Sequence, residues 1–557
     1  MESLTPQSSR RTAMPEGVMS IEEGNQQKRA SRTLSKAVSL HLEGKMEIAA
    51  RLLEKAIEGG ENDPSLFSAL GHIQYEMRDY EAAAATYARM VQAEPMHRTA
   101  HFNLGVCRGN LQKWRPAAEA FRSALEADAS RAEALLGLGI SLIHAGSPAQ
   151  ALEPLDKYLS LFPDHEQALF GKGVALQQTG RPAEAVEYYR KVLARNPRCE
   201  EAVSNLVAMF LEKKDHVSVR RYAQMLVELQ PDSPVAAEAM ATLAFSEGDF
   251  NTAARYCNNL AQWIPDRFEN WFNLGVAYHK LGDYQKAANA YEQAAALNPQ
   301  SLQSHLNLGV ARQELSDLAG ARASYEKALE IDPSQAGVLW NLALVLEQQG
   351  ERKAAEQLYA RIGRDAAEYG DARFRLGYLR LLGGENPADY QASAEAFQEC
   401  LSRRADWPEA WLNSGIAFAR SSRLAEARRC FEETLMLRPD SSDAVRGLAA
   451  LALDQQDFDE ALNLHQRLIE LGEHSPELFY NAGLICQRRG NAQDAVGFYQ
   501  QALSEDPQFA EALLNLGHAY MDLGQEDEAR SHWRKAIREK PELAQSYFEP
   551  AAAQGLA

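Results

Sequence analysis

Residue types that commonly perform chemistry are present in this chain, but none of them forms a recognised catalytic or metal-binding pattern. The thirteen histidines are scattered, and no HExxH zinc motif, GxSxG nucleophile elbow or phosphate-binding GxxxxGK loop occurs. Two glycine pairs, Gly137 with Gly139 and Gly171 with Gly173, match half of a dinucleotide-binding fingerprint. Neither pair follows a predicted strand, which that fingerprint requires. We therefore expect no catalytic residues, no metal site and no cofactor.

The cysteines indicate a reducing environment, because none of them forms a C-x-x-C pair. A free thiol on a helix packs as a small apolar side chain, and unpaired cysteines are typical of reducing compartments. Residues 1–20 lack the apolar core of a secretory signal, and no stretch approaches the roughly 18–20 apolar residues of a membrane span. The sequence therefore predicts a cytoplasmic protein without a membrane span. The six cysteines are Cys107, Cys199, Cys257, Cys400, Cys430 and Cys486.

A period of 34 residues organises the chain from about residue 30 onward. Gly275 lies 34 residues before Gly309, and Pro299 lies 34 residues before Pro333. The eleventh repeat is four residues longer than the others, with the extra length at 383–389. A fixed period of this length predicts a repeat architecture. The fifteen repeats start at Ala30, Pro64, Arg98, Ala132, Glu166, Glu200, Pro234, Phe268, Leu302, Ala336, Gly370, Pro408, Ser442, Pro476 and Ala510.

Each unit also has a characteristic internal pattern. The unit that starts at Phe268 carries, in this order, Trp271, Leu274, Gly275, Tyr278, Ala287, Tyr291, Ala294 and Pro299. This pattern resembles the tetratricopeptide (TPR) repeat family, and the resemblance covers nearly the whole chain. The resemblance implies pairs of antiparallel helices, here called helix A and helix B, that stack into an all-α, right-handed superhelical solenoid.

The residues themselves favour two short helices in each unit. Leu274 and its neighbours follow a helical apolar period, and Gly282 offers the left-handed conformation that the turn needs. Pro299 prevents the second helix from continuing. Small residues such as Gly275 and Ala287 let neighbouring helices approach closely, because a larger side chain there would push the helices apart.

The register predicts five segments along the chain. Residues 1–29 form a disordered N-terminal segment, 30–369 ten gapless repeats, 370–407 one repeat with a four-residue insertion, 408–543 four repeats, and 544–557 a capping segment and tail. The insertion contains two glycines and a proline, so it is expected to lengthen the turn, either as a hinge or as a tolerated surface insertion. A short capping helix is expected over 541–548, because a terminal repeat must cover its exposed face.

The charge of the chain restricts its partners. The net charge is −19 and the sequence pI is about 5.3. A basic footprint is missing, which argues against nucleic-acid binding and against an anionic membrane surface. Like charges keep a long solenoid dispersed in solution, and attraction of basic partners is an alternative reading of the same charge.

The resemblance implies that helix A lines an inner groove, with the second, fifth, ninth, twelfth and thirteenth positions of each repeat facing inward. The fifth and ninth positions are apolar through much of the chain. Exposed apolar strips of this size tend to bind partners, although the same side chains also pack against neighbouring helices. We predict peptide contacts at the position-5 residues Phe102, Phe170, Phe272, Leu306, Trp340 and Phe374.

Position 6 carries a column of asparagines. The column is similar to the asparagine ladder in the TPR region of O-GlcNAc transferases, where the resemblance implies that side-chain amides hold an extended peptide. An amide offers a donor and an acceptor together, so it can bind any peptide unit. The alternative is a hydrogen bond within the asparagine's own repeat. The column consists of Asn103, Asn205, Asn273, Asn307, Asn341, Asn413, Asn481 and Asn515.

These features predict a non-enzymatic interaction scaffold that binds peptide segments of partner proteins in its groove. The carboxylate clamp of TPR co-chaperones needs Lys at position 5 and Asn at position 9, and no repeat has either. One alternative is a substrate-recruiting or regulatory subunit of an enzyme complex, for example a glycosyltransferase system whose catalytic domain is on another chain. A structural assembly factor of a larger complex is another, and self-association is possible in each case.

Overall fold

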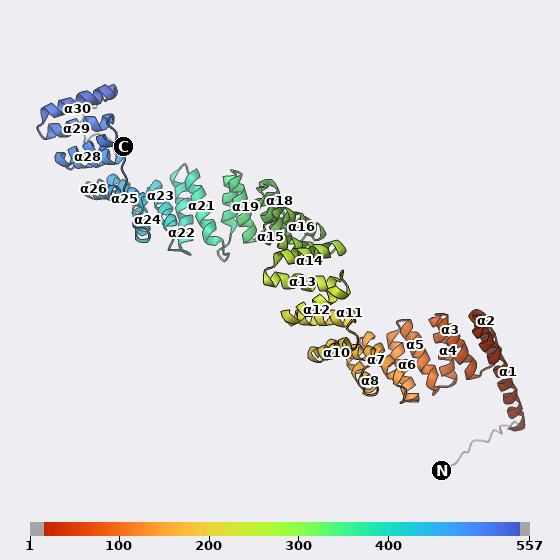
Figure 1. Ribbon diagram of the computed structural model, residues 1–557. Coiled ribbons are helices and arrows are strands. Elements are labelled where there is room, and N and C mark those ends of the chain that lie inside the picture. The colour runs from red at the N-terminus through yellow and green to blue at the C-terminus, as the bar shows by residue number, and fades with distance from the viewer. Residues whose placement is uncertain (1–15, 546–557) are drawn as a thin grey trace, which may run out of the picture. The chain divides into compact units, whose positions relative to one another are not determined.

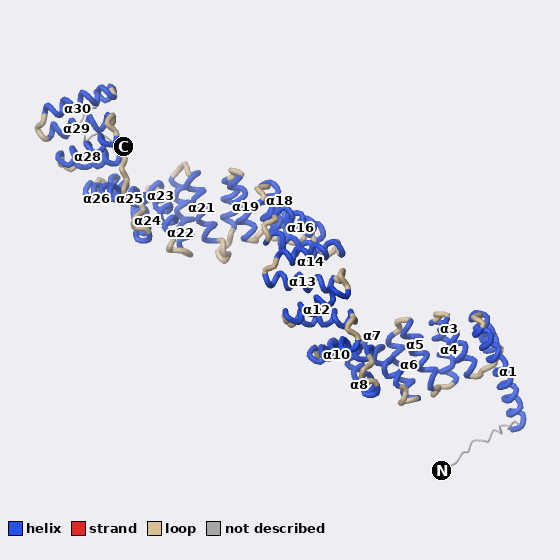
Figure 2. Tube along the Cα trace, viewed as in Figure 1, coloured by secondary structure: helices blue, strands red, loops and turns tan. Residues whose placement is uncertain are grey.

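The computed structural model describes residues 16–545, with side chains from Lys28 onward. Within this part of the chain all regular structure is helical and no strand occurs, as Figures 1 and 2 show. Thirty α-helices are followed by one short 3-10 turn. Within α1–α14 and within α15–α30, consecutive helices pack against each other in pairs, and each pair packs against the next. The predicted all-α solenoid of helix pairs is therefore confirmed.

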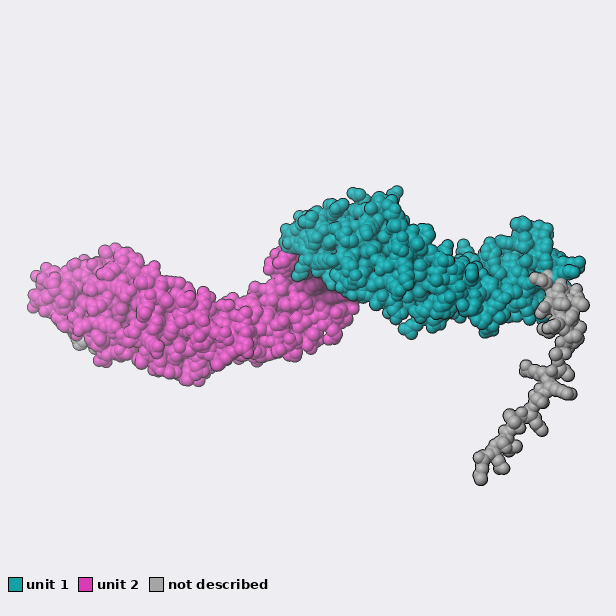
Figure 3. All heavy atoms as spheres, turned by 90° about the horizontal axis from the view of Figure 1, so that it is seen from below, with its two compact units in different colours: residues 1–265 teal, residues 266–557 magenta. Residues whose placement is uncertain are grey.

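The chain divides into two compact units, residues 1–265 and 266–557 (Figure 3). The boundary lies between the seventh and eighth repeats, where the 34-residue period continues without interruption. The first unit contains α1 (Glu16–Leu42), α2 (Met46–Glu58), α3 (Pro64–Glu76), α4 (Tyr80–Ala93), α5 (Arg98–Asn110), α6 (Trp114–Ala127), α7 (Ala132–His144), α8 (Pro148–Leu161), α9 (Glu166–Gln178), α10 (Pro182–Arg195), α11 (Glu200–Glu212), α12 (His216–Leu229), α13 (Pro234–Glu247) and α14 (Phe250–Trp263).

The second unit holds the eighth to fifteenth repeats. It contains α15 (Phe268–Lys280), α16 (Tyr284–Leu297), α17 (Leu302–Glu314), α18 (Leu318–Ile331), α19 (Ala336–Gln348), α20 (Arg352–Arg361), α21 (Tyr369–Gly383), α22 (Pro387–Leu401), α23 (Pro408–Arg420), α24 (Leu424–Leu437), α25 (Ser442–Asp454), α26 (Phe458–Glu470), α27 (Pro476–Arg488), α28 (Ala492–Glu505), α29 (Ala510–Asp522), α30 (Glu526–Glu539) and the 3-10 turn η1 (Pro541–Ala544). From Pro64 onward, helix A begins at the first residue of each repeat, except that α21 begins one residue early at Tyr369.

The turn between the two helices of a repeat follows from a few local residues. Gly282 has a φ of +75°, so it adopts the left-handed conformation expected of it. Asp283 then accepts a hydrogen bond from the backbone N–H of Lys286 at 3.2 Å and caps α16. In the next repeat Ser316 occupies the left-handed position, with a φ of +61°, and Asp317 is the cap. In the third repeat Gln112 has a φ of +56° and Lys113 makes no side-chain cap bond, so neither glycine nor aspartate is obligatory in this turn.

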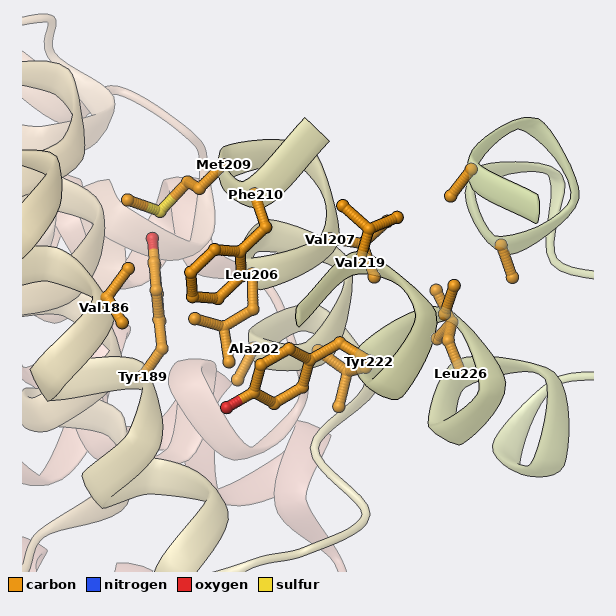
Figure 4. Packing of buried hydrophobic residues seen from close by; sticks show 14 of the residues in the cluster. Val186, Tyr189, Ala202, Leu206, Val207, Met209, Phe210, Val219, Tyr222 and Leu226 are labelled. Atoms are coloured by element: carbon orange, nitrogen blue, oxygen red, sulfur yellow. The ribbon is translucent and has the colours of Figure 1, made fainter. Parts of the chain in front are cut away.

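The core of most repeats contains a small residue under a large ring. Gly275 lies directly beneath the ring of Tyr291, and Gly309 lies beneath that of Tyr325. Both tyrosines are almost completely buried, and so is Ala287. Figure 4 shows a cluster of buried apolar residues in the first unit, in which the rings of Phe210 and Tyr222 stack with centroids 5.6 Å apart. Close packing of this kind leaves no room for larger side chains at the small positions.

The N-terminal prediction is wrong in part. Residues 16–29 were expected to be disordered, whereas α1 starts at Glu16. This stretch is rich in good helix formers, among them Glu22, Glu23, Gln26 and Gln27, so the first helix extends beyond the start of the repeat. Residues 1–15 lie outside the described part of the chain.

The insertion in the eleventh repeat also differs from expectation. The helices α21 and α22 have 15 residues each, compared with 13 and 14 for α23 and α24. Only residues 384–386 remain between α21 and α22, so the turn is not lengthened. Asn386 caps α22 and Pro387 occupies its first turn, while the Tyr390 hydroxyl donates to the carbonyl of Gly384 at 2.7 Å. Of the four extra residues, one therefore lies in each helix, and two lie in the connection 402–407, which has six residues compared with the four of 298–301.

At the other end of the second unit, the predicted capping helix is a single 3-10 turn in the described residues. Leu543 of η1 packs against a cluster that contains Leu513, Leu514 and Trp533. This contact covers part of the last repeat, which is the function expected of a capping segment. The remaining residues of the predicted helix, and the tail, lie outside the described part.

Buried His465 makes the stability of the second unit pH-dependent. Its ring is 5% exposed, and its Nδ1 donates to the carbonyl of Ala461 at 2.7 Å. Burial lowers the pKa of His465 below its ordinary value. Below pH ~6.5 the unfolded chain protonates this histidine before the folded chain does, so we expect the free energy of unfolding to fall as the pH decreases through this range. Denaturation at several pH values should give a shallower slope for His465→Leu than for the wild type.

Candidate peptide-binding face

The predicted position-5 residues each pack against a ring on helix B of the same repeat. The ring centroids of Phe102 and Phe121 are 5.7 Å apart, and the other aromatic pairs have similar geometry. All six predicted position-5 residues are half-buried. Each therefore belongs partly to the core of its repeat and partly to the surface. The remaining aromatic pairs are Phe170–Tyr189, Phe272–Tyr291, Trp340–Tyr359 and Phe374–Phe397.

Some of these rings are covered by the residue that precedes the next helix A. The guanidinium of Arg131 lies 4.0 Å from the ring centroid of Phe102, and Trp407 stacks on Phe374 with centroids 4.4 Å apart. Sequence reasoning missed these covering residues, because they stand outside the repeat signature. Their position in the sequence is nevertheless regular, since each is the N-cap of the following helix A.

The position-5 residues of the eighth and ninth repeats are followed by smaller polar residues at that N-cap. Ser301 follows Phe272, and Gln335 follows Leu306. A serine hydroxyl or an unstacked glutamine covers less apolar surface than an indole or a guanidinium plane. Phe272 is instead covered by Phe268 of its own helix, with ring centroids 5.6 Å apart, and Phe272 and Leu306 are both half-buried.

Some position-6 asparagines have a structural role. The Tyr189 hydroxyl donates to Gln177 Oε1 at 2.7 Å and accepts from Asn205 Nδ2 at 3.1 Å. This bond joins helix A of one repeat to helix B of the repeat before it. Asn307 instead accepts at its Oδ1 from Gln303 Nε2 at 3.0 Å, which is the within-repeat bond that was the alternative to peptide contact.

The asparagines of the column differ in accessibility. Asn515 is fully buried and donates to the Tyr480 hydroxyl at 2.9 Å, so it lies out of reach of a ligand. Asn273 is exposed, and Asn341 and Asn413 are half-buried. In the described residues, these last three amides make no side-chain hydrogen bond with the rest of the chain. The predicted ladder therefore divides into two groups. Some asparagines stabilise the packing of helices within the solenoid, and others have side-chain amides that are free to hydrogen-bond to a ligand.

The two groups of asparagines can be separated by stability measurements. Replacing Asn205 by Ala leaves the buried Tyr189 hydroxyl with one partner fewer, so we expect a loss of about 1 kcal/mol in the free energy of unfolding. Replacing exposed Asn273 by Ala should change stability by less than ~0.5 kcal/mol. Urea denaturation of the two variants tests this difference, and equal effects would contradict the division.

The thiols in the described part are poorly suited to chemistry. All six cysteines are buried. Burial raises the pKa of Cys107 to about 11 and that of Cys257 to about 12. Because the thiolate is the nucleophilic form, these groups are almost entirely protonated and unreactive at neutral pH. None of the helices within residues 16–545 combines the length and the apolarity needed to cross a membrane.

The family of the chain follows from its repeats. Family models described as "Tetratricopeptide repeat" match residues 68–108, 108–166, 166–199, 240–306, 387–444, 415–476, 446–508 and 488–553, and a model described as "TPR repeat" matches 311–350. Together these matches cover most of the chain. The protein belongs to the TPR family. The more specific similarity to the TPR region of O-GlcNAc transferases stays a prediction.

Similar curated TPR proteins match only short stretches. The Photosystem I assembly protein Ycf3 of Prochlorococcus marinus (strain MIT 9303) is 27% identical over 95 residues, which is 16% of this chain and 55% of Ycf3. The human mitochondrial import receptor subunit TOM70 is 23% identical over 128 residues, 23% of this chain and 21% of TOM70. The chain thus spans about half the length of the Ycf3 relatives.

Among solved structures, similar chains have low identity and low TM-scores. The structure of Naa15/Naa10 bound to HypK-THB gives a TM-score of 0.33 at 14% identity, covering 94% of this chain and 86% of the other. The TPR protein YrrB, described as having an unusual peptide-binding site, gives 0.26 at 22% identity, covering 41% of this chain and 97% of YrrB.

Proposed function

We propose that this TPR protein is a non-enzymatic interaction scaffold, and that helix A of its repeats binds extended peptide segments of partner proteins. The observation that carries the proposal is a row of half-buried apolar side chains on α15, α17 and α19 beside unengaged amides on α15 and α19. Phe272, Leu306 and Trp340 are half-buried there, and the side-chain amides of Asn273 and Asn341 make no hydrogen bond with the described residues. A peptide bound at this face would use both kinds of contact.

The two kinds of contact have different consequences for recognition. An amide side chain can donate to and accept from the main chain of any peptide, so the asparagines supply affinity with little sequence preference. Apolar pockets accept particular side chains and therefore supply specificity. The net charge of −19 favours peptides that carry basic residues beside the apolar ones.

Capture from a cell extract followed by cross-linking mass spectrometry tests this proposal. We expect partner peptides to cross-link to helix A of the eighth to tenth repeats, with lysines such as Lys280 at the end of α15 as reporters. Cross-links confined to helices B would overturn the proposed binding face. A reproducible turnover of any substrate by the purified chain would overturn the non-enzymatic assignment.

A role as an assembly factor of a larger complex is the second candidate. It is favoured by the 95-residue similarity to the Photosystem I assembly protein Ycf3. Copurification of several subunits of one complex would support it, whereas copurification with a single catalytic subunit would favour a regulatory role in an enzyme system.

A further inference from the structure

A crevice of about 540 Å³ opens between helices B of the eighth and ninth repeats. Its walls come from α16 and α18 and its floor from α17, all within the second unit. The floor residues His305 and Leu308 are buried, and so is Ser324 on the α18 wall. The rim residues Lys327 and Glu330 are exposed. The crevice is lined by residues other than the position-5 and position-6 residues of helix A, so it is separate from the candidate peptide-binding face.

The crevice exists because one repeat lacks a large apolar side chain. Ala295 lines it, near the end of helix B. At the corresponding position most other repeats carry a leucine, isoleucine or valine. This side chain is in most cases half-buried and packs against the buried residues of its own and neighbouring repeats. Deleting such a side chain leaves unfilled volume, since the surrounding helices relax only partly. Examples of the large residue are Val91, Leu125, Leu159, Leu193, Leu329, Leu435 and Leu503.

The first unit offers a direct comparison. The same crevice between α6 and α8 has a volume of about 320 Å³ and is lined by Leu125, Leu135, Leu138 and Leu142. In the second unit Ala295 stands in place of Leu125, and His305 stands in place of Leu135. The crevice in the second unit is therefore both larger and more polar at its floor.

His305 leaves one buried hydrogen-bond acceptor without a partner. The ring is 6% exposed, and its Nε2 lies 3.1 Å from the carbonyl oxygen of Pro299. A carbonyl only accepts, so Nε2 carries the proton and Nδ1 of the neutral ring is an acceptor. Nδ1 is buried and has no partner among the described residues. An unpaired buried acceptor of this kind costs free energy, which a donor would recover if it reached the His305 ring from the crevice that this residue lines.

The other polar groups of the crevice are already engaged or balanced. Arg312 Nη1 donates to Ser324 Oγ at 2.9 Å and to the carbonyl of Gly320 at 3.2 Å, and Arg312 is also paired with Glu292. Lys327 and Glu330 on the rim carry opposite charges. The crevice therefore favours a neutral occupant with an apolar body and one hydrogen-bond donor.

We propose that this crevice binds the indole side chain of a tryptophan from a partner protein. The indole N–H is a donor without an acceptor, which matches Nδ1 of His305, and the ring would contact Ala295, Leu308 and Ile331. The volume is within the range of pockets that hold small ligands. That the indole belongs to a partner protein rests on the scaffold function proposed above. That the crevice binds an indole does not depend on that function.

Ligand-observed NMR with N-acetyl-L-tryptophanamide tests the site in the full-length protein. We expect saturable binding with a Kd on the order of millimolar for so small a probe. Ala295→Leu restores the side chain that most other repeats carry, so it should preserve the fold and weaken binding at least about tenfold. Gln293→Leu adds the same side chain to α16 outside the crevice and should leave binding unchanged.

A second variant tests the hydrogen bond to His305. Trp411 occupies the corresponding position in the twelfth repeat, where its Nε1 donates to the carbonyl of Ala405 at 2.8 Å. His305→Trp should therefore keep the bond to the Pro299 carbonyl and remove the Nδ1 acceptor, with loss of probe binding. The naphthalene analogue of the probe, which lacks the N–H, should bind at least about tenfold more weakly to the wild type.

The outcomes separate this proposal from the peptide-binding function. Unchanged binding in Ala295→Leu, or equal binding of the indole and naphthalene probes, would overturn the indole site. Tighter binding of free tryptophan than of the blocked probe would overturn the assignment to a partner's side chain. Changes at Phe272 should not affect the probe, so a failure of the helix-A face leaves the indole measurement intact.

Discussion

Gly275→Leu is expected to destabilise the eighth and ninth repeats by about 3 kcal/mol or more. A Cβ built on Gly275 would lie 2.6 Å from Cδ1 and Cε1 of the Tyr291 ring, which is closer than real Cβ atoms approach. Tyr291 is 1% exposed and cannot swing into solvent without opening the core of its repeat. Overpacking commonly costs about 1–3 kcal/mol, and a branched side chain against a fixed ring lies at the upper end of that range.

Gly497→Leu is the matched control for this substitution. Gly497 lies in α28, and nothing is within 4 Å of a Cβ built on it. Because leucine is a better helix former than glycine, the control should stabilise α28 by about 0.5–1 kcal/mol. Opposite signs for the two glycine substitutions would show that packing, and not loss of glycine as such, destabilises the eighth repeat.

Hydrogen exchange should show where the destabilisation by Gly275→Leu occurs. Repeats contact only their neighbours, so protection should fall first in α15, α16 and α17. Helices of the first repeats, such as α3 and α4, should keep their protection under the same conditions. A uniform loss of protection along the whole chain would contradict this nearest-neighbour picture.

The second large effect is expected at the candidate peptide-binding face. Replacing Asn273, Asn341 and Asn413 together by Ala should weaken many partners by similar factors, because contacts to a peptide main chain carry no sequence information. Hydrogen bonds contribute about 0.5–1.5 kcal/mol each, so three of them correspond to about one to three orders of magnitude in Kd. Asn307 is left unchanged because its side chain is already engaged, accepting at Oδ1 from Gln303 Nε2 at 3.0 Å.

A substitution of the apolar residues should have a different signature. Replacing Phe272 and Trp340 by Leu should change which partners are preferred, since side-chain pockets determine specificity. Captured partners and their Kd values for both variants provide the measurement. Asn289→Ala is the control, because Asn289 is exposed on helix B of the eighth repeat. If both variants kept every partner at wild-type affinity, helix A would not be the binding face.

The sequence by itself determined the local features of this fold. The 34-residue steps from Pro64 onward give the starts of nearly all the first helices, and Gly282 has the left-handed φ that its place in the turn requires. Small residues such as Gly275 and Ala287 were recognisable as close-contact positions, and the structure buries them. These features depend on residues within one repeat, so the repeat signature contains enough information to predict them.

Tertiary structure decided the features that depend on contacts between repeats. Asn205 and Asn273 occupy the same position of the repeat, yet only Asn205 meets a tyrosine hydroxyl from the preceding repeat. Phe102 and Phe272 are likewise equivalent in sequence, but Arg131 covers only the former. In each case the exposure of a side chain is set by atoms from another element, which the spacing of residues within one repeat does not specify.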